Sequence, residues 1–367
     1  MSQSTSHYES LRQSLIEKLK DTEVHCKIVT MPDYFLDHSL TCDFDPNTLA
    51  KRLLTVASRG GGEISNIHQS LEVGGNAAIC TLALGKLGAS VRPIMKTDPL
   101  GLSLFRQACT GTSVDFSGVK LTQWSPLMTT ILELRRGKRI ANVMLGDVSN
   151  TTPFDFEDLN PADLKAIDGA GYVGVFNWLY NLKGTNLVDR VFTYCRDHST
   201  AHTFLDTADP RPRIKELPQF VGVLKRGLVD VLGLNENEAL IFADQFESGR
   251  HRSDPVEASR VIADHTGNRV CLHTVEYSAS VSRDGVAIAP AFAITPIRGT
   301  GAGDSWNAGW LVGDSLGLIG EEGLLFANAV AARYVSNPTR AHATVANVRE
   351  FLMASGSKLK KLKASKR

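Results

Sequence analysis

Gly299-Thr300-Gly301-Ala302-Gly303-Asp304-Ser305-Trp306-Asn307-Ala308-Gly309 is the stretch from which the rest of the chain is best interpreted. It follows a β-like run, Val286 to Ile297, and it opens a helical run. The glycines let the backbone turn tightly, and the following helix presents unpaired N-terminal amides and the positive end of its dipole. This combination predicts an anion site suited to a phosphate.

Asp304 lies at the edge of this predicted anion site. A carboxylate repels a bound phosphate, so its presence is explained if it accepts a proton from a hydroxyl that attacks the phosphate. The structural alternative is a glycine-rich turn in which Asp304 caps the helix. A dinucleotide-binding fingerprint fits poorly, because it requires an acidic residue roughly 20 positions further on. The sequence downstream is instead mainly helical.

Composition excludes several classes of function. The chain has 367 residues and a formal net charge of +1, which gives no strong field for nucleic acid or an anionic membrane. No run approaches the roughly 18 apolar residues of a membrane span, and residues 1–20 lack the apolar segment of a secretory signal. The six cysteines show no C-x-x-C spacing, which favours reduced core residues. We therefore expect a cytoplasmic protein with neither a membrane nor a nucleic-acid partner.

Short apolar runs alternate with helical segments from about Leu164 onward, which predicts βαβ units and a parallel sheet. Ligands of such sheets bind at the carboxyl ends of the strands. Polar residues that directly follow the apolar runs are therefore candidate site residues, namely Asn177, Asp206, Asn235 and His273.

The predicted organisation is one main domain over residues 24–355. An N-terminal helical extension over residues 1–23 precedes it, and a basic, disordered tail over residues 356–367 follows it. Two segments, about 36–66 and 120–148, are mixed or hairpin-like and are expected to form a small lid of β-strands.

Two motifs in the first third of the chain are candidate parts of a ligand pocket. Gly74 and Gly75 precede a clear helical run that begins at Asn76 and ends at Gly88, and two glycines allow a close backbone approach to a ligand. The alternative is a plain turn before a helix. Asp37 follows the first predicted strand, where a carboxylate can bind two hydroxyls of a polyol; the alternative is a solvated loop acid.

A third motif joins an amide and a carboxylate three residues apart, Asn235 and Glu238, at the end of an apolar run. Such a pair can hold the water shell of Mg²⁺ or contact phosphate, because Mg²⁺ prefers few carboxylates and several waters. The alternative is a helix cap, since Asn at the cap and Glu three residues later form a capping box.

These motifs, in this order, resemble the PfkB family, the ribokinase-like carbohydrate and nucleoside kinases, over about residues 24–351. Gly301 to Leu311 is similar to the family's C-terminal signature, G-A-G-D followed by an aromatic residue and A-G. Gly74-Gly75 with Leu84 to Ala89 resembles the N-terminal signature, and Asn235-x-x-Glu238 resembles the N-x-x-E motif. The resemblance implies a three-layer α/β/α sandwich with a mainly parallel central sheet and a small β-lid, often dimeric through that lid.

The resemblance also implies a function, the ATP- and Mg²⁺-dependent phosphorylation of a hydroxyl group of a small sugar or sugar-like acceptor. Asp304 would be the base, and we expect the helix dipole to keep it ionised. The backbone amides of Gly301, Ala302 and Gly303 would form the anion hole. The acceptor pocket would be lined by Asp37, Gly74, Gly75 and Asn76. Nucleotide phosphates and Mg²⁺ would be held by Asn235 and Glu238, the latter through water, with His273 and Asn328 as further nucleotide candidates.

Three departures from the family pattern leave alternatives open. Ile79 replaces an Asn that contacts sugar hydroxyls, which leaves a nucleoside kinase as an alternative. Arg298 replaces an Asp that often helps bind a monovalent cation, so K⁺ activation is not expected, and Arg298 is either a fixed charge or a surface arginine. The stretch that begins at His273 replaces a Lys/Gly-rich nucleotide segment. The other alternative to a sugar kinase is a non-catalytic ligand-binding member of the family, and the intact Asp304 argues against it.

Overall fold

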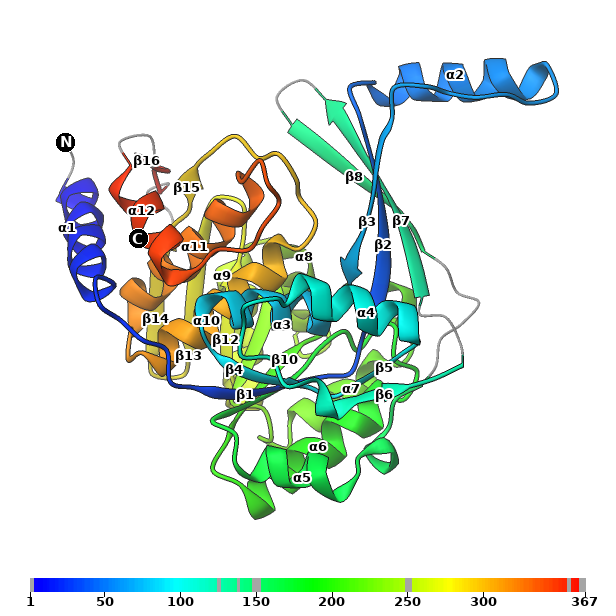
Figure 1. The fold of residues 1–367 in the computed structure, drawn as a ribbon. Helices are drawn as coiled ribbons and strands as arrows, with labels where there is room; N and C mark the ends of the chain where they lie inside the picture. The colour runs from blue at the N-terminus through cyan, green and yellow to red at the C-terminus, as the bar shows by residue number, and fades with distance from the viewer. Residues whose placement is uncertain are drawn as a thin grey trace.

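The computed structural model describes residues 3–123, 127–136, 139–146, 153–247, 253–354 and 358–362. Within these ranges an α/β body carries a smaller sheet that projects from one side (Figure 1). Parts of three predicted segments lie outside the described residues. They are 1–2 in the N-terminal extension, 124–126, 137–138 and 147–148 in the second lid segment, and 356–357 and 363–367 in the tail.

The body is built on an eight-stranded sheet with the order β14-β13-β12-β11-β10-β9-β1-β4. The six strands from β12 to β4 run parallel, and β13 and β14 complete the sheet as antiparallel strands. The predicted mainly parallel sheet is therefore confirmed. The strands are β1 (Lys27–Met31), β4 (Ser90–Pro93), β9 (Tyr172–Val175), β10 (His202–Asp206), β11 (Val231–Asn235), β12 (Arg269–His273), β13 (Tyr277–Ser282) and β14 (Gly285–Pro290).

Helices cover both faces of this sheet. Side chains that are adjacent along a strand pack into opposite layers, as Ile28 and Val29 do on β1 and Phe204 and Leu205 do on β10. Burial of both faces is the reason these strands appear as continuous apolar runs. The three-layer α/β/α sandwich is thus confirmed. One layer contains α3 (Asn76–Leu87), α10 (Ala302–Ser315), α11 (Gly320–Val335) and α12 (Val345–Met353), and the other contains α5 (Pro161–Asp168), α6 (Gly184–His198), α7 (Leu217–Leu224), α8 (Glu236–Ala243) and α9 (Pro255–Thr266).

The projecting sheet, which we call the lid, has the strand order β3-β2-β7-β8. It consists of β2 (Phe35–Cys42), β3 (His68–Gly74), β7 (Leu127–Arg136) and β8 (Arg139–Gly146). β2 pairs in parallel with β7, and the two outer pairs are antiparallel. Smaller elements beside the lid are α4 (Pro99–Ala108), β5 (Met95–Thr97), β6 (Val119–Leu121) and the short helix η1 (Phe116–Gly118).

The lid differs from the prediction in two respects. β3 lies beyond the predicted segment 36–66, and that segment contains a helix, α2 (Pro46–Ser58), which extends from the far end of the lid (Figure 1). Asp45 caps α2 by accepting hydrogen bonds from the amides of Asn47 and Thr48, and Pro46 occupies its first turn. Leu49, Leu53 and Val56 recur at helical spacing, so the sequence carried a signal for α2, although Leu49 is its only buried residue.

Both ends of the chain join the body. Leu15 and Ile16 of α1 (Gln3–Lys18) are buried in the core beside α11, so the predicted extension is packed against the main domain. The predicted strand from Val286 to Ile297 is divided into β14 and β15 (Phe292–Ala293), because Pro290 has no N–H for the ladder. β16 (Lys358–Leu359) pairs with β15, so the predicted disorder of the tail is wrong at these two residues.

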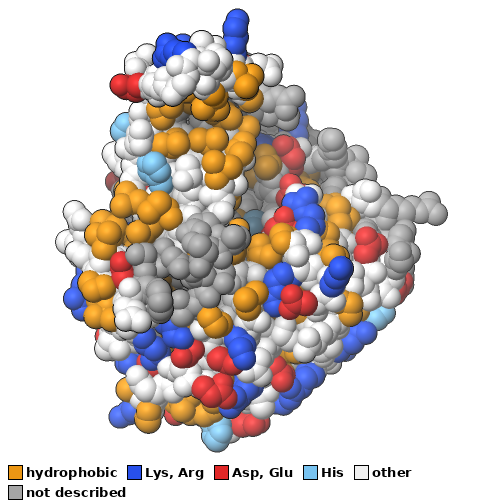
Figure 2. Space-filling view, turned by 90° about the vertical axis from the view of Figure 1, so that its right-hand side faces the viewer, with side chains coloured by type: hydrophobic (Ala, Val, Ile, Leu, Met, Phe, Trp, Pro, Cys, Tyr) orange, Lys and Arg blue, Asp and Glu red, His pale blue; other side chains and the backbone are white. Residues whose placement is uncertain are grey.

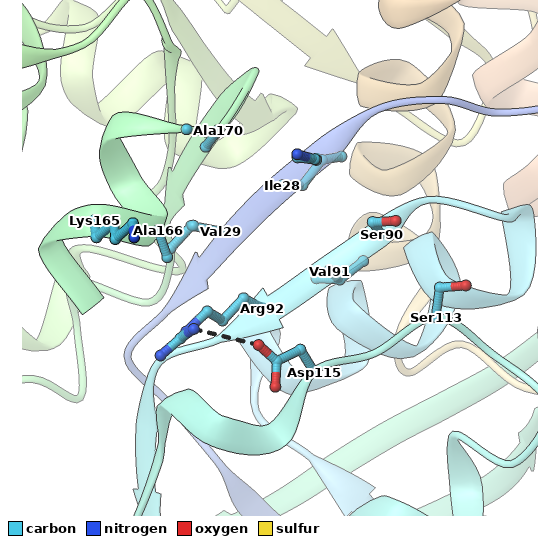
Figure 3. Close-up of a pocket in the computed structure, with 12 residues that line it drawn as sticks. Ile28, Val29, Ser90, Val91, Arg92, Ser113, Asp115, Lys165, Ala166 and Ala170 are labelled. Carbon is cyan, nitrogen blue, oxygen red and sulfur yellow. Dashed lines mark hydrogen bonds and ion pairs between the residues drawn. The ribbon is translucent and has the colours of Figure 1, made fainter. Parts of the chain in front are cut away.

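A cavity of about 330 Å³ lies between β1, β4 and α5 (Figure 3). It contains none of the predicted site residues.

All six cysteines are free thiols and five of them are buried, as their spacing predicted. Within the described ranges, every helix lacks either the length or the hydropathy that a bilayer span requires.

Gly309 should be essential for the packing of α10 on α11. A Cβ atom at this position would lie 2.9 Å from the Cα of Ala327 and 3.0 Å from the Cβ of Val330. We expect Gly309→Ala to lower the free energy of unfolding in urea by about 1–3 kcal/mol. The control is Gly222→Ala on α7, where nothing lies within 4 Å and the added methyl should be neutral or stabilising. Equal losses in both variants would contradict this packing argument.

Candidate active site

The carboxyl ends of the parallel strands bring polar side chains to one edge of the sheet. Asp206, Asn235 and His273 end β10, β11 and β12, and Asn177 follows β9. Asp33, which was not among the predicted residues, follows β1. Asp33, Asn177 and Asp206 are buried, so this edge holds charged and amide groups that solvent barely reaches.

The predicted glycine turn forms the N-terminus of α10 at this edge. Gly301 is the N-cap residue with φ of +78°, and no side chain caps the helix. A Cβ at Gly301 would lie 2.7 Å from Tyr334 Oη, and one at Gly303 would lie 3.0 Å from His273 Nε2. The positive φ favours glycine at Gly301, and a side chain at Gly303 would require His273 to shift. The uncapped backbone amides of this turn suit an anion.

Asp304 lies in the first turn of α10 and is only 7% exposed. Its Oδ1 is buried and has no hydrogen-bond partner among the described residues, so Asp304 does not cap its helix. Burial, together with the charges of Asp206, Asp33 and Asp37, raises the pKa of Asp304 well above its ordinary value. The dipole of α10 acts in the opposite sense, because it favours the ionised form of Asp304.

Asp33 holds the N-terminus of α3. Its carboxylate accepts hydrogen bonds from the amides of Asn76 at 2.8 Å and Ala77 at 2.9 Å, and from Asn177 Nδ2 at 2.8 Å. Gly75, the N-cap residue, has no side chain with which to do this. The sequence held an indirect signal, because a helix that begins after two glycines needs a cap from elsewhere in the chain.

Asp37 lies on β2 and is 7% exposed, so the alternative of a solvated loop acid is wrong. A Cβ at the facing Gly74 would lie 2.1 Å from Asp37 Oδ1, which explains the glycine. No hydrogen bond to the Asp37 carboxylate is found among the described residues. Burial and the charge of Glu72 raise the pKa of Asp37 to about 7, and Arg298 partly opposes them. The structure thus brings Asp37, Gly74, Gly75 and Asn76 together, with Asp33 among them.

Asn235 and Glu238 form a reciprocal capping box at the start of α8, so the structural alternative for this motif is confirmed. Asn235 Oδ1 accepts from the Glu238 amide at 3.0 Å, and Glu238 Oε2 accepts from the Asn235 amide at 2.9 Å. Burial and the charge of Asp206 raise the pKa of Glu238. Burial also raises the pKa of Asp206, which accepts a hydrogen bond from Asn307 Nδ2 at 2.6 Å. Asp206 and Glu238 are thus two neighbouring buried carboxyl groups, and the guanidinium of Arg211 interacts electrostatically with Glu238.

His273 and Asn328 both contact Trp306. The His273 ring stacks on Trp306 with centroids 5.2 Å apart, its Nδ1 is buried without a partner in the described structure, and burial lowers its pKa to about 4. Asn328 accepts a hydrogen bond from Trp306 Nε1 at 2.8 Å and donates to the carbonyls of Ala289 and Pro290. Protein partners therefore account for the polar groups of Asn328, whereas His273 retains an unsatisfied nitrogen.

Arg298 is buried, so the alternative of a surface arginine is wrong. Its guanidinium lies 4.7 Å from the centre of the Tyr334 ring, and its Nη2 donates to Glu72 Oε2 at 2.7 Å.

No group of three or more His, Cys, Asp or Glu side chains is placed to hold a metal within the described ranges.

Comparison with known proteins agrees with this geometry. The model of a family described as "pfkB family carbohydrate kinase" matches residues 49–344, and no curated protein sequence matches the chain. Similar solved structures include 2-dehydro-3-deoxygluconokinase from Thermotoga maritima. It is 14% identical over 90% of this chain and 99% of that chain, with a TM-score of 0.70. Adenosine kinase from Sinorhizobium meliloti is 18% identical over 86% of this chain and 95% of that chain, with a TM-score of 0.66. Ribokinase from Cryptococcus neoformans in complex with ADP is 14% identical over 90% of this chain and 99% of that chain, also with a TM-score of 0.66. At such identities the likeness shows the fold, which is ribokinase-like as predicted.

Replacing Asp37 by asparagine should stabilise the protein at pH 8. The pKa of Asp37 is raised to about 7, so the folded state binds this proton more tightly than the unfolded chain does. The resulting stability is present at low pH and is lost as the pH rises through 7. Asp37→Asn removes this loss, which amounts to at most about 4 kcal/mol.

The measurement is the melting temperature at pH 5 and pH 8. We expect a rise of a few degrees for Asp37→Asn at pH 8 and a smaller rise at pH 5. Asp284→Asn, at an exposed turn, is the matched control and should change neither value. An equal rise at both pH values would show that the charge of Asp37 is not the cause.

Proposed function

Because the chain belongs to the pfkB family of carbohydrate kinases and is accordingly a phosphotransferase that acts on an alcohol group, we propose that it transfers the γ-phosphoryl group of ATP to a hydroxyl of a small sugar or sugar-like acceptor. The observation that carries the proposal is the position of Asp304. Its buried carboxylate has an oxygen without a hydrogen bond and lies at the uncapped N-terminus of α10.

Asp304 is the base in this reaction. The acceptor oxygen attacks the γ-phosphorus, its proton passes to the Asp304 carboxylate, and the bond between the γ-phosphorus and the bridging oxygen breaks to release ADP. The raised pKa makes the ionised carboxylate a stronger base than an exposed aspartate. The amides of Gly301, Ala302 and Gly303 stabilise the charge on the transferred group, with the dipole of α10 behind them.

The acceptor binds between the lid and the body. Asp37 is buried and its carboxylate has no hydrogen bond in the described structure, so it is available to accept bonds from acceptor hydroxyls. Gly74, Gly75 and Asn76 form the adjoining backbone at the start of α3. The lid excludes water that would otherwise accept the phosphoryl group.

The neighbouring carboxyl groups of Asp206 and Glu238 fit Mg²⁺. Each is buried, each has a raised pKa, and oxygen ligands supplemented by water are what Mg²⁺ prefers. Glu238 would hold the ion through water, with Asp206 beside it. When bound, Mg²⁺ neutralises charge on the nucleotide phosphates. Asn235 and His273 are paired across adjacent strands and would contact those phosphates, the neutral imidazole as a hydrogen-bond donor.

A nucleoside is the second candidate acceptor. Phe35 lies two residues before Asp37 on β2, so both side chains leave the same face of the lid. Phe35 packs against Tyr180 with ring centroids 5.4 Å apart, and Tyr180 is partly exposed. A pair of aromatic rings beside a carboxylate that binds hydroxyls would suit an acceptor that joins a planar base to a sugar.

The outer face of the lid is a candidate dimer interface. Leu71, Met128, Val143 and Leu145 are exposed on this face, and Figure 2 shows hydrophobic side chains gathered over the lid, in the upper part of the view. Monomeric proteins rarely expose contiguous apolar patches of this kind. A homodimer through the lid would cover them.

Asp304→Asn should abolish most of the activity. We expect ADP formation from Mg-ATP, assayed across sugars, phosphosugars and nucleosides, to fall by about 10²–10⁴-fold in this variant. Asp314→Asn, on the same helix but bonded to Tyr172 Oη, is the control and should retain activity. Acceptor-dependent turnover that survives Asp304→Asn would eliminate Asp304 as the base. Turnover with nucleosides alone would select the second candidate.

Leu145→Arg should convert the homodimer into a monomer. A charged side chain in the centre of an apolar interface is costly to bury, so the two lids should separate. Light scattering after size exclusion measures the mass. Ile319→Arg, at an exposed apolar residue outside the lid, is the control. A wild-type protein that elutes as a monomer would refute the dimer.

A further inference from the structure

Arg298 lies between the lid and the loop that leads into the anion site. Its Nη2 donates to Glu72 Oε2 on β3 at 2.7 Å, and its Nη1 donates to the carbonyl oxygen of Arg340 at 3.2 Å. The guanidinium also covers the Tyr334 ring. One buried cation therefore connects a lid strand with two loops of the body.

Arg340 makes a second set of contacts with the lid. Its Nη1 donates to Glu72 Oε1 at 3.0 Å and to Ser70 Oγ at 3.4 Å. Its Nη2 donates to Thr41 Oγ1 at 2.9 Å and to Glu133 Oε2 at 3.4 Å. These contacts reach β3, β2 and β7. Arg340 has φ of +59°, a conformation that a non-glycine residue keeps only when its surroundings hold it.

The fourth lid strand also touches the anion loop. Asn142 Nδ2 on β8 donates to Thr300 Oγ1 at 3.0 Å. A Cβ at Gly299 would lie 2.8 Å from the same Nδ2, so the lid approaches the backbone of this loop closely. All four strands of the lid are thus joined to the segments on either side of α10 and α11.

We propose that Arg298 and Arg340 are positioning residues for the acceptor: by binding the lid carboxylates Glu72 and Glu133 they fix β2 and β3 over the anion loop and hold Asp37 in the pocket that contains Asp304. We call these four residues, Arg298, Arg340, Glu72 and Glu133, the clamp. The inference rests on the proposed function, since it assigns the clamp a role in binding the acceptor.

The pairing of β2 with β3 carries the effect of the clamp to Asp37. Asp37 lies directly opposite Glu72 in the register of these strands, so a displacement of Glu72 moves Asp37 as well. The clamp also limits charge in the pocket. Glu72 forms ion pairs with the guanidinium groups of Arg298 and Arg340. The charge of Glu72 raises the pKa of Asp37, and the charge of Arg298 lowers it. ATP would bind on the other side of Asp304, where the clamp makes no contact.

The test compares Arg298→Met, Arg298→Lys, Glu72→Gln and the Arg298→Met/Glu72→Gln double variant. Steady-state kinetics give kcat and the KM for the acceptor and for ATP. Hydrogen exchange measures the protection of the β2 and β3 amides. Arg226→Met is the matched control, since it breaks an ion pair with Asp189 on the opposite helical layer. Melting curves verify that each variant is folded.

We expect Arg298→Met to raise the KM for the acceptor about tenfold, which corresponds to about 1.4 kcal/mol, and to leave the KM for ATP nearly unchanged. Arg298→Lys should recover part of the loss. The double variant should lose less than the product of the two single losses, because both remove the same contact. Exchange should become faster in β2 and β3 but not in the central sheet. Equal rises in both KM values, or no rise in the KM for the acceptor, would overturn the proposal.

Failure of the clamp and failure of the proposed function give different results. If the wild-type protein phosphorylates no acceptor, the proposed function fails. The exchange data still decide whether Arg298 fixes the lid. Protection of β2 and β3 that is identical in Arg298→Met and in the wild type would overturn the clamp whatever the activity.

Discussion

The constraint on which this structure depends is the burial of carboxyl groups at one edge of the sheet. Asp33, Asp37, Asp206, Glu238 and Asp304 are all nearly inaccessible to solvent. Desolvation raises the pKa of all five groups, and neighbouring carboxylates add to this shift in every one except Asp33. Shifted pKa values of this kind cluster at functional sites.

The N-termini of α3, α8 and α10 hold predicted site residues, and these three termini differ in how they are capped. α3 is capped by Asp33, which comes from another part of the chain, and α8 is capped by its own Asn235 and Glu238. α10 has no side-chain cap at Gly301. Of these three helices, α10 is the one whose terminal amides no side chain occupies, and such a terminus suits a phosphate.

The lid completes this site through charge. Its inner face carries Asp37, Glu72 and Glu133, and the body supplies Arg298 and Arg340. Two of the three lid carboxylates are thereby neutralised, and Asp37 is not. In the proposed function, the paired carboxylates fix the geometry of the lid, and the unpaired Asp37 would accept hydrogen bonds from neutral hydroxyl groups. Solved structures with 14–18% identity share the fold, so the fold by itself does not identify the acceptor.

The sequence by itself determined the features that depend on local patterns: the parallel strands, the helix from Asn76 to Leu87, the turn at Gly301 and the family. It also identified Asp304, Asp37 and the Asn235–Glu238 pair as candidates, because glycine positions and strand ends are visible along the chain. Only the tertiary structure showed that Asp33 caps α3, that Arg298 is buried against Glu72, and that burial and three carboxylates raise the pKa of Asp304. These outcomes depend on contacts between segments far apart in sequence and on desolvation, and neither has a periodicity that a single sequence displays.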